Sequence, residues 1–135
     1  MNQIIDRDHG YNALMKLASQ VDFGTVTVGI HDADASKPEG EDSGVTVGEI
    51  AAVHEFGLGV PRRSWLRDWV DGAQDEIRKT ITATAAAIVM DPGRREQMLE
   101  RLALWAKAQI QKRIIAGIEP ELTEETKARK AKVGG

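Results

Sequence analysis

The pair His54-Glu55 is the part of the sequence that comes closest to a catalytic motif. A zinc protease helix of the H-E-x-x-H type needs a second histidine four residues after the first, because residues at that spacing share one helical face. Leu58 occupies that position, and it follows Gly57, a residue type that commonly ends helices. The spacing therefore argues against a zinc site, and we expect His54 to be a partly buried or interfacial polar residue.

Other motifs that could support catalysis or metal binding are incomplete. The acidic run from Asp32 begins like a calcium-binding loop, which needs glycine at its sixth position and a bidentate glutamate at its twelfth. The chain has Lys37 and Ser43 at those positions, and it contains no Gly-x-Ser-x-Gly nucleophile elbow and no phosphate-binding glycine loop. The absence of cysteine excludes thiol catalysis, thiolate metal sites and disulfides. We therefore expect no catalytic residue, no metal and no cofactor.

Two functions stay open when the residues are considered alone. A small metal-dependent hydrolase would use His54 and Glu55 together with His31, and it would need a pocket that gathers them. A nucleic-acid-binding accessory protein would use Arg94-Arg95 and the basic C-terminal tail. That tail has no interleaved aromatic residue for base stacking, and the net charge of the chain is −3. Contact with nucleic acid is therefore expected to be incidental.

The charge is distributed unevenly along the 135 residues. Residues 1–93 carry 8 basic and 15 acidic side chains, whereas residues 94–135 carry 10 basic and 6 acidic ones. Opposed charge of this kind can steer copies of one chain into head-to-tail or ring contacts. The first residues do not resemble a secretory signal, and the longest apolar stretch, residues 81–90, is far shorter than a membrane span. We expect a protein made in the cytoplasm that has no membrane partner.

Hydrophobic periodicity predicts helices separated by one strand. A helix is expected over residues 8–19, and Val26, Val28 and Ile30 then alternate with small residues as in a half-buried strand. Residues 32–44 are expected to form a mobile acidic loop. Thr46 and Glu49 match a capping box, so a second helix should start there and end at Gly57.

The second half of the chain is predicted to be helical. Ser64 can cap a third helix, whose apolar stripe includes Ile81 and runs to Ile88. Asp91-Pro92 is a typical start for a fourth helix, which ends near Gly117 and has an apolar stripe that includes Ala106, Ile110 and Ile114. A short helix should follow from Thr123 within the basic tail, residues 124–135.

These elements together predict a single α+β domain over residues 1–135, in which a small antiparallel sheet packs against two long helices that form a hairpin. A lone strand cannot leave its backbone groups unpaired in a core. Its partners are expected near residues 45–47, around Val60, or in a neighbouring subunit.

Two segments resemble a known family. Residues 50–57, Ile-Ala-Ala-Val-His-Glu-Phe-Gly, and residues 60–67, Val-Pro-Arg-Arg-Ser-Trp-Leu-Arg, are similar to the "A-A-hydrophobic-H-E-F-G" and "I-P-x-R-P-F-L-R" patterns of tailed-phage virion-morphogenesis proteins. Ser64 and Trp65 depart from that pattern, which has Pro and Phe. Residues 121–130 resemble the "P-L-[ST]-x-x-T-x-x-R-K" segment of the same family, with Pro120 displaced by one position.

The resemblance implies a structural protein of the virion at the head–tail junction, a tail-completion or neck component with no enzymatic activity. Its partners would be other copies of itself in a ring, with six copies expected, and the neighbouring head connector and tail tube or terminator proteins. Charge reversal at Arg63 or Arg67 is predicted to abolish junction assembly while the monomer stays folded. The residues that we expect to make the protein contacts are His54, Glu55, Phe56, Gly57, Pro61, Arg63, Trp65, Leu66, Arg67, Arg129 and Lys130.

Overall fold

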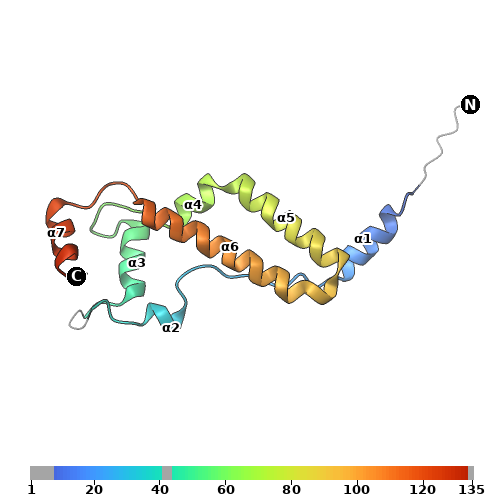
Figure 1. Ribbon diagram of the computed structural model, residues 1–135, viewed down its shortest axis with the longest axis horizontal. Coiled ribbons are helices and arrows are strands. Elements are labelled where there is room, and N and C mark those ends of the chain that lie inside the picture. Colours follow the sequence, from blue (N-terminus) through green and yellow to red (C-terminus); the bar gives the residue numbers. More distant parts are fainter. Residues whose placement is uncertain (1–7, 41–43, 134–135) are drawn as a thin grey trace, which may run out of the picture. The chain divides into compact units, whose positions relative to one another are not determined.

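The computed structural model describes residues 8–40 and 44–133, and about two-thirds of the chain is helical (Figure 1). The α-helices are α1 (Tyr11–Gln20), α2 (Asp32–Ala35), α3 (Val47–Phe56), α4 (Arg67–Gly72), α5 (Gln74–Met90), α6 (Arg95–Ala116) and α7 (Glu124–Val133), and a 3-10 helix, η1 (Pro92–Arg94), lies between α5 and α6. The chain divides into two compact units, each described here by itself. Unit 1 comprises Met1–Thr27 and Asp75–Leu104, and unit 2 comprises Val28–Gln74 and Trp105–Gly135.

Unit 1 contains α1, nearly all of α5, η1 and the first part of α6. The turn between α5 and α6 forms as predicted, because the side chain of Asp91 accepts a hydrogen bond from the N–H of Gly93 at 3.2 Å and Pro92 occupies the first position of η1. Asp22 forms an ion pair with Arg95 at 3.1 Å. Gly24 has a positive φ of 73° and lies against α6, where a Cβ atom would be 2.7 Å from the Cδ1 of Leu99, so a larger residue would strain the backbone and displace this side chain.

Unit 2 contains α2, α3, α4, the second part of α6, and α7. Helix α3 has the predicted capping box: the N–H of Glu49 donates to the Thr46 hydroxyl at 3.2 Å, and the N–H of Thr46 donates to the Glu49 carboxylate at 2.8 Å. The helix ends at Gly57, which takes the left-handed conformation with φ 70°. Helix α2 packs against α3. The predicted start and end of α3 are therefore confirmed.

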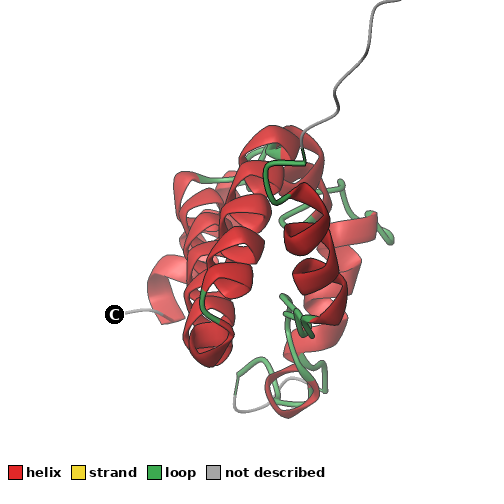
Figure 2. Ribbon diagram, turned by 90° about the vertical axis from the view of Figure 1, so that its right-hand side faces the viewer, coloured by secondary structure: helices red, strands yellow, loops and turns green. Residues whose placement is uncertain are grey.

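The predicted α+β fold with an antiparallel sheet is wrong. The described residues contain no strand, as Figure 2 shows, and their β-type pairing is limited to one isolated antiparallel bridge between Pro38 and Thr46. The segment predicted as a strand, residues 25–30, has no regular secondary structure and includes a bend at Gly29. Val26 and Val28 are still more buried than their neighbours. The alternation of apolar and small residues therefore predicted which side chains are buried, but it did not predict whether the segment pairs as a strand. Residues 45–47, one of the predicted strand partners, instead lead into the start of α3.

Two predicted elements also differ in extent. The third helix is interrupted: α4 ends at Gly72 and α5 begins at Gln74. The Gln74 side chain donates to the Val70 carbonyl at 3.0 Å, an acceptor that a continuous helix would pair with the backbone N–H of Gln74. The predicted acidic loop contains the short helix α2, and its residues 41–43 lie outside the described residues.

Few of the predicted core positions are buried. In the described part of the chain, the buried apolar residues are Ile88, Ala106 and Ile110, all from the predicted helical stripes. Ile81 and Ile114 belong to the same stripes but are exposed. In the ranges that the structure describes, no helix combines the length and the apolar character that crossing a membrane requires.

Candidate functional site

The segment that resembles the phage pattern forms a sharp connection between α3 and α4 in unit 2. We call residues 55–68 the corner. At its centre lies Glu55, the last but one residue of α3, whose side chain is only 7% exposed. A carboxylate so deeply buried must have hydrogen-bond donors around it, because an unpaired buried charge is very costly.

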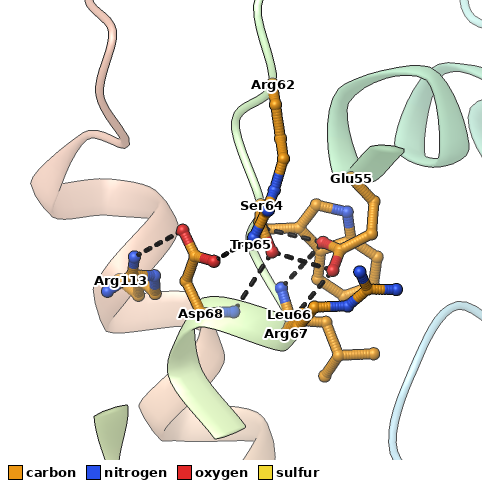
Figure 3. A network of polar contacts seen from close by, with 8 residues as sticks. All are labelled: Glu55, Arg62, Ser64, Trp65, Leu66, Arg67, Asp68 and Arg113. Atoms are coloured by element: carbon orange, nitrogen blue, oxygen red, sulfur yellow. Dashed lines mark hydrogen bonds and ion pairs between the residues drawn. The ribbon is translucent and has the colours of Figure 1, made fainter. Parts of the chain in front are cut away.

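The chain supplies four donors to the Glu55 carboxylate, as Figure 3 shows. The Ser64 hydroxyl donates to Oε1 at 2.8 Å, and Ser64 is itself 1% exposed. The backbone N–H groups of Trp65 and Leu66 donate to Oε2 at 2.9 and 3.0 Å, and that of Arg67 donates to Oε1 at 2.9 Å. Glu55 thus pairs backbone donors where α4 begins, as a capping side chain would, although it comes from another helix.

These contacts also determine how Glu55 ionises. Burial raises the pKa of its carboxyl group, but the hydrogen bonds from Leu66, Arg67, Ser64 and Trp65 outweigh burial and leave the pKa below its ordinary value. Hydrogen bonds to a carboxylate favour its charged form. Glu55 is therefore a carboxylate at neutral pH, and a tightly held one.

A second set of contacts extends from Ser64 to α6. The Ser64 hydroxyl accepts a hydrogen bond from the N–H of Asp68 at 3.1 Å. The Asp68 carboxylate pairs with Arg62, and its other oxygen lies 3.6 Å from Arg113 of α6. Figure 3 shows these side chains as one connected network. The corner is therefore tied both to α3 and to the part of α6 that belongs to unit 2.

Arg63 and Trp65 also make contacts within the chain. The guanidinium of Arg63 donates to the backbone carbonyls of Pro120 and Glu121, at 2.5 and 2.9 Å. The indole N–H of Trp65 donates to the carbonyl of Ala51 at 3.2 Å, and the side chain is half-buried. Both residues were predicted to contact other proteins, and the structure places their polar atoms on the chain itself.

Phe56, Pro61 and Arg67, which were predicted to contact other proteins, are exposed at the surface of the corner, and so are Leu58 and Val60, which were not among the predicted contacts. Phe56 and Leu58 are 55% and 60% exposed, and Val60 is also exposed. The guanidinium of Arg67 lies 5.4 Å from the centre of the Phe56 ring, within the range of a cation–π contact. We call Phe56, Leu58, Val60 and Arg67 the corner patch; Pro61 is exposed beside it.

The remaining predicted residues are spread more widely. His54 and Leu66 are half-buried, and Gly57 ends α3. Arg129 and Lys130 lie in α7, far along the chain, and the structure describes their backbone only. Sequence reasoning missed Asp68, Arg62 and Arg113. The pair of Asp68 with Arg113 joins segments far apart in sequence, and that of Asp68 with Arg62 depends on how the corner folds, so neither leaves a periodic signal.

The site shows no arrangement typical of catalysis. Both carboxylate oxygens of Glu55 already accept two hydrogen bonds each, so this residue is poorly placed to act as a general base or a metal ligand. Across residues 8–40 and 44–133, no group of three or more His, Asp or Glu residues could hold a metal ion. What the corner offers is a rigid connection with an apolar, basic outer surface.

Comparisons with protein-family models, with curated proteins and with solved structures find no match for this chain.

Proposed function

We propose that this chain is a structural component of the head–tail junction of a tailed phage, a tail-completion or neck protein that assembles as a ring of six copies and joins the tail to the head connector. It would act by protein–protein contacts alone, in the virion, after synthesis in the host cytoplasm. Its neighbours would be the head connector and the tail tube or terminator protein.

The exposure of large apolar side chains is the observation on which this proposal rests. Three apolar residues are buried among the described residues, whereas many large ones are exposed, and contiguous exposed apolar surface marks interaction sites in soluble proteins. The exposed ones include Tyr11, Leu14, Met15 and Leu17 of α1, Phe56 and Leu58 of the corner, and Ile114 and Ile115 of α6. Such surface is expected of a chain that completes its core against other subunits.

The corner supports the same proposal in a second way. Glu55 and Arg63 hold the connection between α3 and α4 through contacts within the chain, so Phe56 and Leu58 are exposed on a fixed backbone. A preorganised surface loses less conformational freedom when it binds. The metal-dependent hydrolase has no comparable support, because its expected base, Glu55, is occupied by four donors.

Native mass spectrometry of the purified protein tests whether it assembles. We expect a discrete ring that forms reversibly with rising protein concentration. Electron microscopy of phage particles made without the protein tests its proposed role in joining heads to tails. We expect filled heads and separate tails, because the joining step would fail. A strictly monomeric protein, or normal particles formed without it, would contradict the proposal.

A further inference from the structure

The two ends of α3 carry surfaces of opposite charge. At the C-terminal end, the corner patch has the exposed apolar side chains of Phe56 and Leu58 and the guanidinium of Arg67, which contacts the Phe56 ring. Arg67 is exposed and forms no ion pair with any residue in the described ranges, whereas the guanidinium of Arg63 is held by backbone carbonyls of its own chain. Arg and aromatic residues are the types most enriched at the centres of protein interfaces.

The N-terminal end of α3 is next to an acidic surface. Helix α2 packs there, and a Cβ atom on Gly48 would be 2.9 Å from the Cβ of Ala35. Ile30, just before α2, is exposed, and Asp32 in its first turn is an exposed acid with no ion-pair partner in the described part of the chain. Asp34 is also exposed but forms an ion pair with Lys37. We call Ile30 and Asp32 the α2 surface.

These two surfaces are held apart within one chain. Helix α3 has 10 residues, so its ends are separated by about 15 Å. Figure 1 shows α2 at one end of α3 and the connection to α4 at the other. The basic and acidic surfaces therefore cannot neutralise each other in the same copy, although they match in charge and both contain exposed apolar side chains.

We propose that the corner patch of one copy docks on the α2 surface of the next copy. This contact deepens the proposed function and rests on it, because it names the two faces through which the ring forms. It is a head-to-tail contact between different surfaces, and such contacts generate closed rings when the rotation between subunits closes. Arg67 would face Asp32 of the neighbouring copy, while Phe56 and Leu58 cover Ile30.

A charge swap tests this pairing. Arg67→Glu and Asp32→Arg each place like charges across the contact, so each variant alone should lose the ring and give monomers at concentrations where the unchanged chain is assembled. The double variant carries the exchanged pair within every contact and should recover the ring. A mixture of the two single variants should also recover it, in alternating order. Native mass spectrometry reads out all four samples, and circular dichroism confirms that each variant is folded.

Arg78→Glu and Asp75→Arg are matched controls, because these residues form an exposed ion pair in α5 and belong to neither surface. They should leave the ring unchanged. Leu58→Ser is a further variant without charge change and should weaken assembly at least tenfold. If Arg67→Glu and Asp32→Arg assemble like the unchanged chain, the proposed pairing of the corner patch with the α2 surface is wrong, but the proposed ring is not contradicted. If the unchanged chain never assembles, both this pairing and the proposed function fail.

Discussion

At the scale of single residues, Glu55 illustrates how a side chain expected at an interface serves the fold. It accepts four hydrogen bonds from residues 64–67, which no local helix pattern would have indicated. Ser64, at a position where the phage pattern has Pro, is nearly as important because its hydroxyl contacts both Glu55 and the N–H of Asp68. Glu55 and Ser64 therefore serve to hold the backbone of the corner in place, and their polar side-chain atoms are used within the chain.

The first prediction concerns the charge of Glu55. Glu55→Gln replaces one acceptor oxygen by an NH₂ group that faces backbone donors, so the free energy of unfolding should fall by about 2–3 kcal/mol. Urea denaturation followed by circular dichroism measures this change. Glu100→Gln, at an exposed position of α6, is the control and should stay within about 0.5 kcal/mol of the unchanged chain. Equal effects of the two substitutions would contradict the role assigned to Glu55.

The second prediction concerns pH. The pKa of Glu55 is lower in the folded chain than in the unfolded one, so its contribution is fully present above the unfolded value, about 4.3 for an ordinary glutamate, and is lost as pH falls through the folded value. The stability difference between the unchanged chain and Glu55→Gln should therefore be constant near pH 7 and shrink below about pH 4. Denaturation curves at several pH values measure it. A difference that grows in acid would give the opposite sign and refute the argument.

At the scale of elements, the end of α3 fixes the start of the corner. Gly57 has φ 70°, and a Cβ atom there would be 3.0 Å from the Cβ of Arg62 and 3.2 Å from its Cα and backbone N. Gly59 has a similar φ of 74° but nothing within 4 Å of its Cβ position. Substitution at Gly59 therefore measures the free-energy cost of a left-handed backbone alone, whereas substitution at Gly57 adds the cost of the steric clash with Arg62.

The third prediction uses this pair. Gly59→Ala should reduce the free energy of unfolding by about 1 kcal/mol, because only the backbone conformation opposes it. Gly57→Ala should cost more, about 2 kcal/mol, because the loop at Arg62 must also move. Thermal unfolding of both variants in parallel measures the difference. Indistinguishable melting temperatures would mean that the close approach of Arg62 does not constrain the corner.

At the scale of the whole molecule, the exposed apolar residues mark the faces through which the proposed assembly would form. Helix α1 contains no buried residue, although Tyr11, Leu14, Met15 and Ala18 have the spacing of one apolar helical face. An amphipathic helix derives most of its stability in water from burying such a face. If the proposed ring forms, another subunit would cover this face.

The fourth prediction tests the face of α1. Leu14→Ser should change the unfolding free energy of the monomer by no more than about 0.5 kcal/mol, the difference in helix propensity, because the side chain is exposed. It should nevertheless raise the concentration needed for assembly about tenfold or more. Lys16→Ser, at a polar position of the same helix, is the control. Light scattering over a concentration series measures both, and equal curves would exclude α1 from the interface.

The amino-acid sequence by itself determined where several of the helices begin and end. The capping box of Thr46 and Glu49, the end of α3 at Gly57 and the turn at Asp91-Pro92 all follow from contacts among residues a few positions apart, and all three predictions are confirmed. Such features depend on backbone groups that only nearby side chains can reach. For the same reason the sequence identified the corner as a distinct segment.

Only the tertiary structure decided which of these residues face one another. The alternation at Val26 and Val28 predicted a strand, but a sheet needs a second segment at hydrogen-bonding distance, and the described residues provide none. The contacts of Glu55 with residues 64–67, of Arg63 with Pro120 and of Asp68 with Arg113 likewise join segments that periodicity treats separately. Spacing along the chain specifies which face of an element is apolar, whereas the residues that pack against that face depend on how the whole chain folds.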